Sequence, residues 1–95
     1  MIFSGEDKME NIIAVFGNRS HTMQFASYLK RMGVRCKTMS TPRELSVSCG
    51  ISCIFPAQNL TQAKFILNRY KFSSFNKFYV INTNGVFKKY QPLFN

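Results

Sequence analysis

The feature that most constrains the fold is the order in which short apolar runs and helix-like spacing alternate along the chain. The run NIIAVFG, residues 11–17, ends at a glycine and predicts a buried strand. Apolar residues at helical spacing then predict a helix over 21–32, with Ser20 as its N-cap and Gly33 as its stop signal. The chain therefore begins with a strand followed by a helix.

The rest of the chain continues this alternation. Residues 34–40 alternate between apolar and polar side chains, which predicts a half-exposed strand. Asn84-Gly85 is a hairpin signal, after which VFKKYQ can pair back as a short fifth strand. Between these segments we expect a strand over 50–55 that ends at Pro56, a helix from Asn59 or Thr61 to about Tyr70, and a strand over 76–83.

This order of elements predicts an α+β protein with the ferredoxin-like βαββαβ sandwich fold. Right-handed crossovers give an antiparallel sheet with strand order 4-1-3-2 and both helices on one face. Residues 11–95 form a single domain, and residues 1–10 are expected to be a flexible lead-in. In this topology GNRSH (17–21), TPRELSVSCG (41–50) and the loop near Lys71 lie at one rim of the sheet.

The charge of the chain indicates which partners it favours, and its apolar runs indicate its compartment. Thirteen Lys and Arg oppose four Asp and Glu, for a net charge of +9, and three of the acids are Glu6, Asp7 and Glu10. Such a positive field favours nucleic acid, an acidic protein surface or a small anion, although a Lys-rich surface also serves solubility. No apolar run approaches the roughly 20 residues of a membrane span, and the start lacks a signal-peptide pattern. We therefore expect a cytoplasmic protein with reduced cysteines.

Cys49 allows two interpretations. If residues 44–50 formed a continuous strand, Leu45, Val47 and Cys49 would share a face, and Cys49 would be a core residue. Alternatively, Gly50 permits a turn that aims backbone N–H groups at the sulfur. Nearby Arg43, Arg19 from the neighbouring loop and the positive end of the first helix would then lower the pKa of a partly exposed thiol.

The segment PRELSVSCG resembles the motif Pro-Arg-Glu-x-Ser-x-x-Cys-Gly of the selenium/sulfur (Se/S) carrier protein-like family of small bacterial proteins. The resemblance covers roughly residues 11–82, including the opening strand and helix and the strand after the motif. It implies a non-enzymatic cytosolic carrier that holds sulfur or selenium on Cys49 as a persulfide or perselenide and delivers it to an acceptor protein. The basic charge and the tail over 84–95 are not expected from the family.

The resemblance and the rim together suggest roles for the surrounding residues. The resemblance maps Pro42, Arg43, Glu44, Ser46 and Gly50 onto the rest of the motif. Arg43 and N–H groups near Gly50 are expected to stabilise the thiolate, Glu44 to orient Arg43, and Ser46 or Ser48 to bond the outer chalcogen. Residues expected to bind an anion or a partner at the rim are Arg19, Ser20, His21, Pro42 and Lys71.

The predicted partners are a sulfur or selenium donor and an acceptor, both with acidic surfaces, and a homodimer is left open. No cofactor is expected. One His and three Cys match no zinc-ligand spacing, so no metal is expected either. Cys36 and Cys53 are expected to be structural, and Cys36 could resolve Cys49 only if the hairpin register brought it across.

Two other functions remain open for a basic domain of this topology. An RNA-recognition module would stack bases on aromatics of the first and third strands, but Phe16 and Phe55 lie at the strand ends. A regulatory domain could instead bind a small anion at the helix that begins after GNRS. Both alternatives predict anion binding without a reactive thiol.

Overall fold

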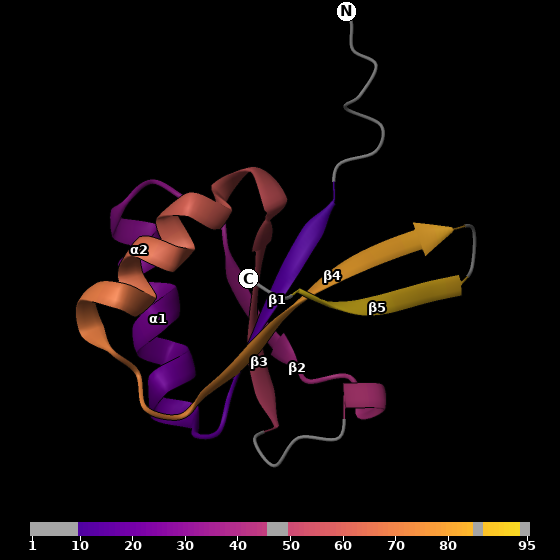
Figure 1. The fold of residues 1–95 in the computed structure, drawn as a ribbon, viewed down its shortest axis with the longest axis horizontal. Helices are drawn as coiled ribbons and strands as arrows, with labels where there is room; N and C mark the ends of the chain where they lie inside the picture. The colour runs from indigo at the N-terminus through magenta and orange to yellow at the C-terminus, as the bar shows by residue number, and fades with distance from the viewer. Residues whose placement is uncertain (1–9, 46–49, 85–86, 94–95) are drawn as a thin grey trace, which may run out of the picture.

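The computed structural model describes residues 10–45, 50–84 and 87–93. Most of the predicted lead-in and Gly85 of the predicted hairpin signal lie outside these residues. No helix in the described part of the chain is long and apolar enough to cross a membrane. The elements, in chain order, are β1 (Asn11–Phe16), α1 (Arg19–Arg31), β2 (Lys37–Ser40), the 3-10 turn η2 (Arg43–Leu45), β3 (Ile51–Pro56), the 3-10 turn η3 (Ala57–Asn59), α2 (Leu60–Tyr70), β4 (Phe75–Asn84) and β5 (Phe87–Leu93) (Figure 1).

The five strands form one antiparallel sheet in the order β2-β3-β1-β4-β5. β1 lies at the centre, where Ala14 pairs with Cys53 of β3 on one side and with Phe78 of β4 on the other. The α+β expectation is confirmed. The observed order differs in detail from the expected 4-1-3-2. The fifth strand, expected as a short pairing of VFKKYQ, is the seven-residue β5 added outside β4, so the structure agrees with a ferredoxin-like sandwich only roughly.

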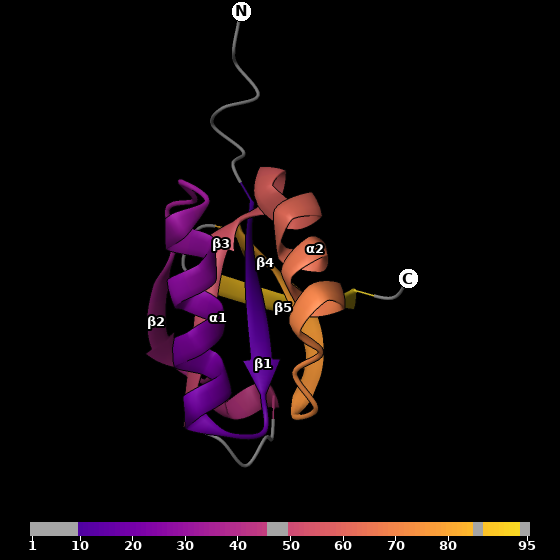
Figure 2. The ribbon, with the colours of Figure 1, turned by 90° about the vertical axis from the view of Figure 1, so that its left-hand side faces the viewer.

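Both helices cover the same face of the sheet, on either side of β1 (Figure 2). The core beneath them is largely aromatic and centres on Phe16, whose ring lies 5.1 Å from that of Phe25, 5.6 Å from Phe72 and 5.4 Å from Phe75. Such tilted and edge-to-face ring pairs are the arrangement that aromatic quadrupoles favour. The rings therefore tie β1 to α1 and to the start of β4.

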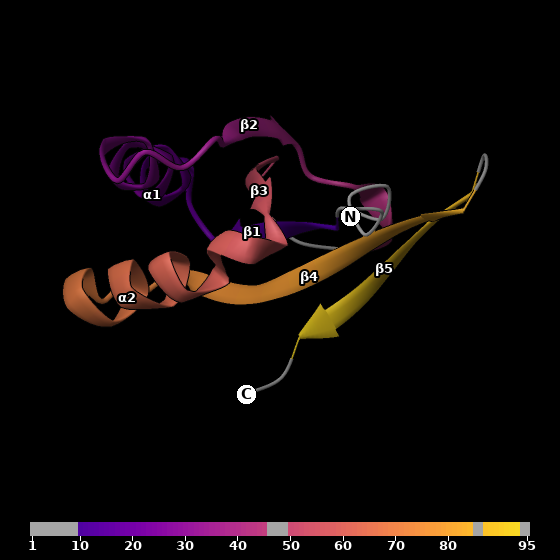
Figure 3. The same cartoon turned by 90° about the horizontal axis from the view of Figure 1, so that it is seen from above.

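The opposite face of the sheet has its own buried residues. Ile13, Val15 and Ser52 are fully buried, although they lie outside the helix-covered cluster. Ser52 shares a 2.6 Å hydrogen bond with the hydroxyl of Thr41. The β4–β5 hairpin runs outward on the side away from the helices (Figure 3).

Several boundaries differ by a residue or more from the sequence-based expectation, and hydrogen bonds explain two of them. α1 begins at Arg19, two residues early, because Asn18 rather than Ser20 is the N-cap: its side chain accepts the N–H of His21 at 2.8 Å. β2 begins only at Lys37, because the chain after Gly33 first closes the helix end, where the N–H of Val34 donates to the carbonyl of Leu29 at 3.0 Å. Gly33 has φ = 81°, as a helix-terminating glycine should.

Candidate functional site

The rim predicted from topology exists, and hydrogen bonds hold its parts together. We define it as residues 17–22, 41–45, 50–51 and 71–74, at the lower end of the sheet in Figure 1. The N–H of Gly17 donates to the carbonyl of Ser74 at 2.6 Å, and Nδ1 of His21 lies 2.6 Å from Oγ of Ser74. The turn before α1 and the loop after α2 are therefore joined directly.

A second pair of contacts brings the Cys-Gly motif region to the start of α1. Oγ1 of the fully buried Thr22 donates to the carbonyl of Ile51 at 3.3 Å. The N–H of Thr41 donates to the carbonyl of Gly50 at 2.9 Å, which closes the base of the connection between β2 and β3. Ser46, Ser48 and Cys49 of the predicted site lie outside the described residues. Their flanks, Leu45 and Gly50, are described and belong to the rim.

The described start of the motif does not form a strand. Arg43, Glu44 and Leu45 make a 3-10 turn, in which the N–H of Leu45 donates to the carbonyl of Pro42 at 3.1 Å. The alternating strand over 44–50 that would have placed Cys49 in the core is therefore absent at its first two positions. Arg43 and Glu44 are both exposed, and within the described residues no ion pair links them. The role of Glu44 in orienting Arg43 thus stays a prediction.

Positive charge gathers at the rim. Arg19 and Ser20 are exposed in the first turn of α1, where the N–H groups lack helical acceptors and the helix dipole is positive. Lys71 is exposed and ends α2 in the left-handed conformation, with φ = 48°. That conformation is unfavourable for a residue with a Cβ atom. With Arg43, exposed cations therefore lie on three segments of the rim, beside the free N–H groups of α1.

The two described cysteines lie in a different environment, inside the sheet. Cys53 is fully buried, and Cys36 is half-buried, with its thiol donating to the carbonyl of Ala26 at 3.4 Å. Burial raises the pKa of both thiols, and the neighbouring Cys36 raises the pKa of Cys53 further. Cys36 lies immediately before Lys37, the first residue of β2. The 46–49 connection follows the other end of that strand. The register therefore places Cys36 beside Cys53 rather than across from Cys49.

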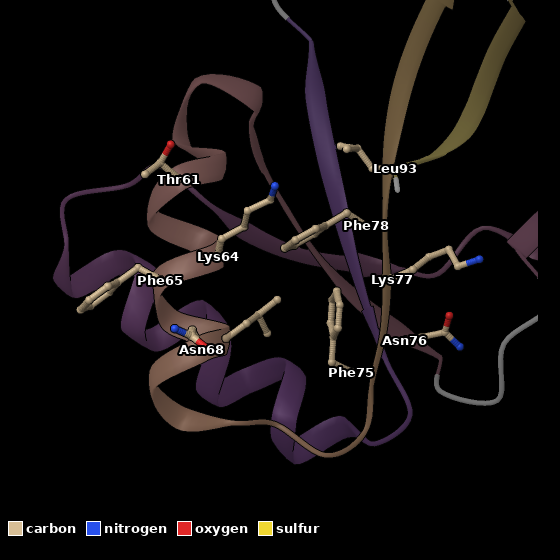
Figure 4. Close-up of a pocket in the computed structure, with 10 residues that line it drawn as sticks. Thr61, Lys64, Phe65, Asn68, Phe75, Asn76, Lys77, Phe78 and Leu93 are labelled. Atoms are coloured by element: carbon tan, nitrogen blue, oxygen red, sulfur yellow. The ribbon is translucent and has the colours of Figure 1, made fainter. Parts of the chain in front are cut away.

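A groove of about 750 Å³ runs between α2 and β4 and carries no thiol (Figure 4). Phe75, Phe78 and Leu93 provide apolar walls, and Lys64 extends over it from α2. None of its lining residues is a Cys, His, Asp or Glu. This groove can accommodate an apolar group but has no thiol among its lining residues, so we place the candidate thiol chemistry at the rim.

Three residues that organise the rim were not identified from the sequence. Asn18 caps α1, Thr22 reaches Ile51, and Ser74 bonds His21. Asn18 could have been recognised, because Asn is as good an N-cap as Ser. Ser74 carried no signal, since its contacts depend on the loop after α2 returning to the turn before α1.

A comparison with protein families matches residues 11–79 to the family described as "Putative Se/S carrier protein-like". The match runs from β1 into β4 and includes the whole 41–50 segment. Searches of the curated proteins and of the solved structures return no match. With more than two thirds of its length matched, the chain belongs to the Se/S carrier protein-like family.

Proposed function

We propose that this protein is a thiol-based carrier that holds sulfur or selenium on Cys49 as a persulfide or perselenide. The observation that carries the proposal is the anchoring of the motif at the rim. Thr22 bonds Ile51, and Thr41 bonds Gly50, so the residue that follows Cys49 is held beside the N-terminal turn of α1. A connection fixed at its base and ended by a glycine is suited to presenting a side chain.

The transfer consists of two exchange reactions without net oxidation. The Cys49 thiolate attacks the outer sulfur of a donor persulfide, R–S–S–H. The donor S–S bond breaks, the donor leaves as a thiolate, and Cys49 carries the new S–S bond. An acceptor thiolate then attacks the outer atom, and Cys49 leaves as a thiolate. Perselenide transfer follows the same steps with selenium as the outer atom.

Both steps need Cys49 as a thiolate, either as nucleophile or as leaving group. Exposed Arg43 and Arg19, together with the N–H groups of the first turn of α1, supply positive potential at the rim. Gly50 is exposed, and among the described residues no atom outside its chain neighbours lies within 4 Å of the position where a Cβ would lie.

The partners proposed for the carrier have acidic surfaces. In the described part of the chain, Glu10 and Glu44 are the acidic residues, and thirteen Lys and Arg are spread over the full sequence. An acidic donor or acceptor would be steered to such a surface, with an association rate that falls as salt rises. We do not propose an RNA module, because Phe16 and Phe55 are buried under the helices and cannot stack on bases.

The test is intact-mass analysis of the protein purified from its native cell without reductant. We expect an added mass of about 32 or 80 units, for one sulfur or selenium atom, that reductant removes. Peptide mapping should place the adduct on Cys49. Cys49→Ser should abolish loading, while the matched variant Cys36→Ala should load normally. Loading that persists in Cys49→Ser would overturn the proposal.

A further inference from the structure

Cys36 and Cys53 form a thiol pair that the carrier function does not use. Cys53 pairs with Thr38 in the β2–β3 ladder, and Cys36 lies two residues before Thr38, toward the same helix-covered core. The two thiols lie near enough for each to affect the pKa of the other, and neither is in a disulfide. They are therefore diagonal neighbours, with Cys36 one residue before β2 and Cys53 in the adjacent strand β3.

One member of the pair opens to a groove. The groove, about 710 Å³, lies between residues 33–37 and 54–59, where β2 has not yet begun and β3 continues. Cys36 is part of its wall, beside Arg35 and Lys37. Gln58 and Asn59 add amide groups, and no acidic residue lines it. Cys53 lies behind Cys36 with no exposed surface.

The geometry points to a second sulfur site: Cys36 exchanges with an anionic, low-molecular-weight disulfide bound in this groove, and Cys53 resolves the product to a Cys36–Cys53 disulfide. Arg35 and Lys37 attract the anionic disulfide, and the amides can bond a peptide-like body. The site is independent of Cys49, which lies beyond the other end of β2.

The reaction balances with the disulfide as oxidant. The Cys36 thiolate attacks one sulfur of R–S–S–R, and one R–S⁻ leaves. The Cys53 thiolate then attacks the Cys36 sulfur of the mixed disulfide, and the second R–S⁻ leaves. The two cysteines lose two electrons, R–S–S–R becomes two R–SH, and these take up the two thiol protons. Because burial raises the pKa of both thiols, alkaline pH speeds both steps.

Forming the Cys36–Cys53 disulfide requires a small backbone movement, and residues 34–36 are the segment that can move. Diagonal neighbours have Cα atoms about 7–8 Å apart, whereas a disulfide prefers about 5.5–6 Å. Residues 34–36 lie outside the strand ladder, so they can approach β3 without breaking strand pairing.

The experiment uses the full chain with Cys49→Ser, so that only the pair reacts. The folded, reduced protein is treated with oxidised glutathione at about pH 8.5, near the ordinary thiol pKa. We expect a mass loss of about two units and a peptide map that links Cys36 to Cys53. With Cys53→Ala added, the mixed disulfide should remain on Cys36, with a gain of about 305 mass units. With Cys36→Ala instead, Cys53 should stay unmodified.

A variant that removes one charge tests whether the cations of the groove attract the anionic disulfide. Lys37→Gln should slow the reaction with oxidised glutathione about threefold but leave that with the neutral 2-hydroxyethyl disulfide unchanged. Mapping the wild-type chain checks that Cys49→Ser has not altered the fold. The proposal is overturned if both thiols remain reduced in the folded protein, if Cys53 reacts as fast without Cys36, or if glutathione stays on Cys36 while Cys53 is present. None of these outcomes bears on chalcogen loading at Cys49, so the two proposals fail separately.

Discussion

The rim and the interior of the sheet are opposite environments for a thiol, because the rim is exposed and the interior excludes water. At the rim, hydrogen bonds from Gly17, Thr22 and Thr41 fix the backbone, and Arg19, Arg43 and Lys71 are exposed. In the interior, packing around Cys53 removes water and stabilises the neutral thiol. On the carrier proposal, the protein holds an accessible thiol and a thiol shielded from solvent only four residues apart in sequence, on either side of the start of β3.

The largest expected effect is the difference in the free energy of unfolding between a variant of the interior and a variant of the rim. Phe16→Ala removes the ring that contacts Phe25, Phe72 and Phe75, and should lower the free energy of unfolding by about 3–5 kcal/mol. Arg43→Ala, at an exposed rim position, should change it by less than about 0.5 kcal/mol. Urea unfolding measures both. Similar losses for the two variants would mean that the rim is part of the core.

The thiols themselves should differ strongly in reactivity. At pH 7 an ordinary thiol is only a few per cent thiolate, and burial reduces that fraction for Cys36 and Cys53. We expect iodoacetamide to modify Cys49 at least about 100-fold faster than Cys53 in the folded protein, with Cys36 between them. Time-resolved peptide mass mapping gives the three rates. Equal rates, appearing only on unfolding, would make Cys49 a core residue.

The pH dependence of stability should report the interior thiols. The pKa of Cys53 is raised from its ordinary value of 9.0, so above that pH the unfolded chain loses its proton first. The stabilising contribution is fully present below about pH 9 and should fall by about 1.4 kcal/mol per pH unit above it. Urea midpoints between about pH 8 and 10.5 measure this slope. Cys53→Ala should flatten the curve relative to wild type, and parallel curves would contradict the raised pKa.

A smaller effect tests how the rim is held together. Thr22→Val removes the hydroxyl that bonds Ile51, while Thr22→Ser keeps it. The lost bond should cost about 1 kcal/mol of stability. If this bond positions the motif, Thr22→Val should also slow Cys49 alkylation several-fold, and Thr22→Ser should not. Quenched alkylation followed by peptide mass mapping gives the Cys49 rate for each variant. Equal rates in Thr22→Val and Thr22→Ser would show that Thr22 is only structural.

The smallest effect concerns Lys71, which ends α2 with φ = 48°. Lys71→Gly relieves the Cβ strain and should raise the free energy of unfolding by about 0.5–1 kcal/mol. Lys71→Ala keeps the strain and should be close to wild type. Thermal unfolding compares them. A destabilised glycine variant would mean that contacts of the Lys71 side chain outweigh its backbone strain.

Much of the fold followed from local patterns, and the errors have physical causes. NIIAVF is apolar and bounded by Gly17, which sufficed to identify β1. Ser20 was predicted as the cap where Asn18 performs that role, because both side chains can accept a backbone N–H. Residues 34–36 have strand-like alternation, but tertiary contacts with the end of α1 override it.

The candidate site was less predictable than the fold. Topology brought the motif, the start of α1 and the loop after α2 to one rim. The bonds that join these parts to α1 use Thr22 and Ser74, and no sequence pattern identifies either residue. The Cys36–Cys53 pair depends on the β2–β3 register, which pairs Thr38 with Cys53. Sequence periodicity identifies which face a strand residue occupies but does not specify its diagonal neighbour.

The central position of β1 has a consequence for biosynthesis. This strand is made early, but its two neighbours come much later: Asn11 pairs with Pro56 and with Ile81. At about 5–20 residues per second, the ribosome needs several seconds to deliver β4 after β1 has been made. Throughout that interval an almost wholly apolar segment has no partner on one side. Until its second half emerges, the nascent chain therefore exposes one edge of β1 that is buried in the folded protein.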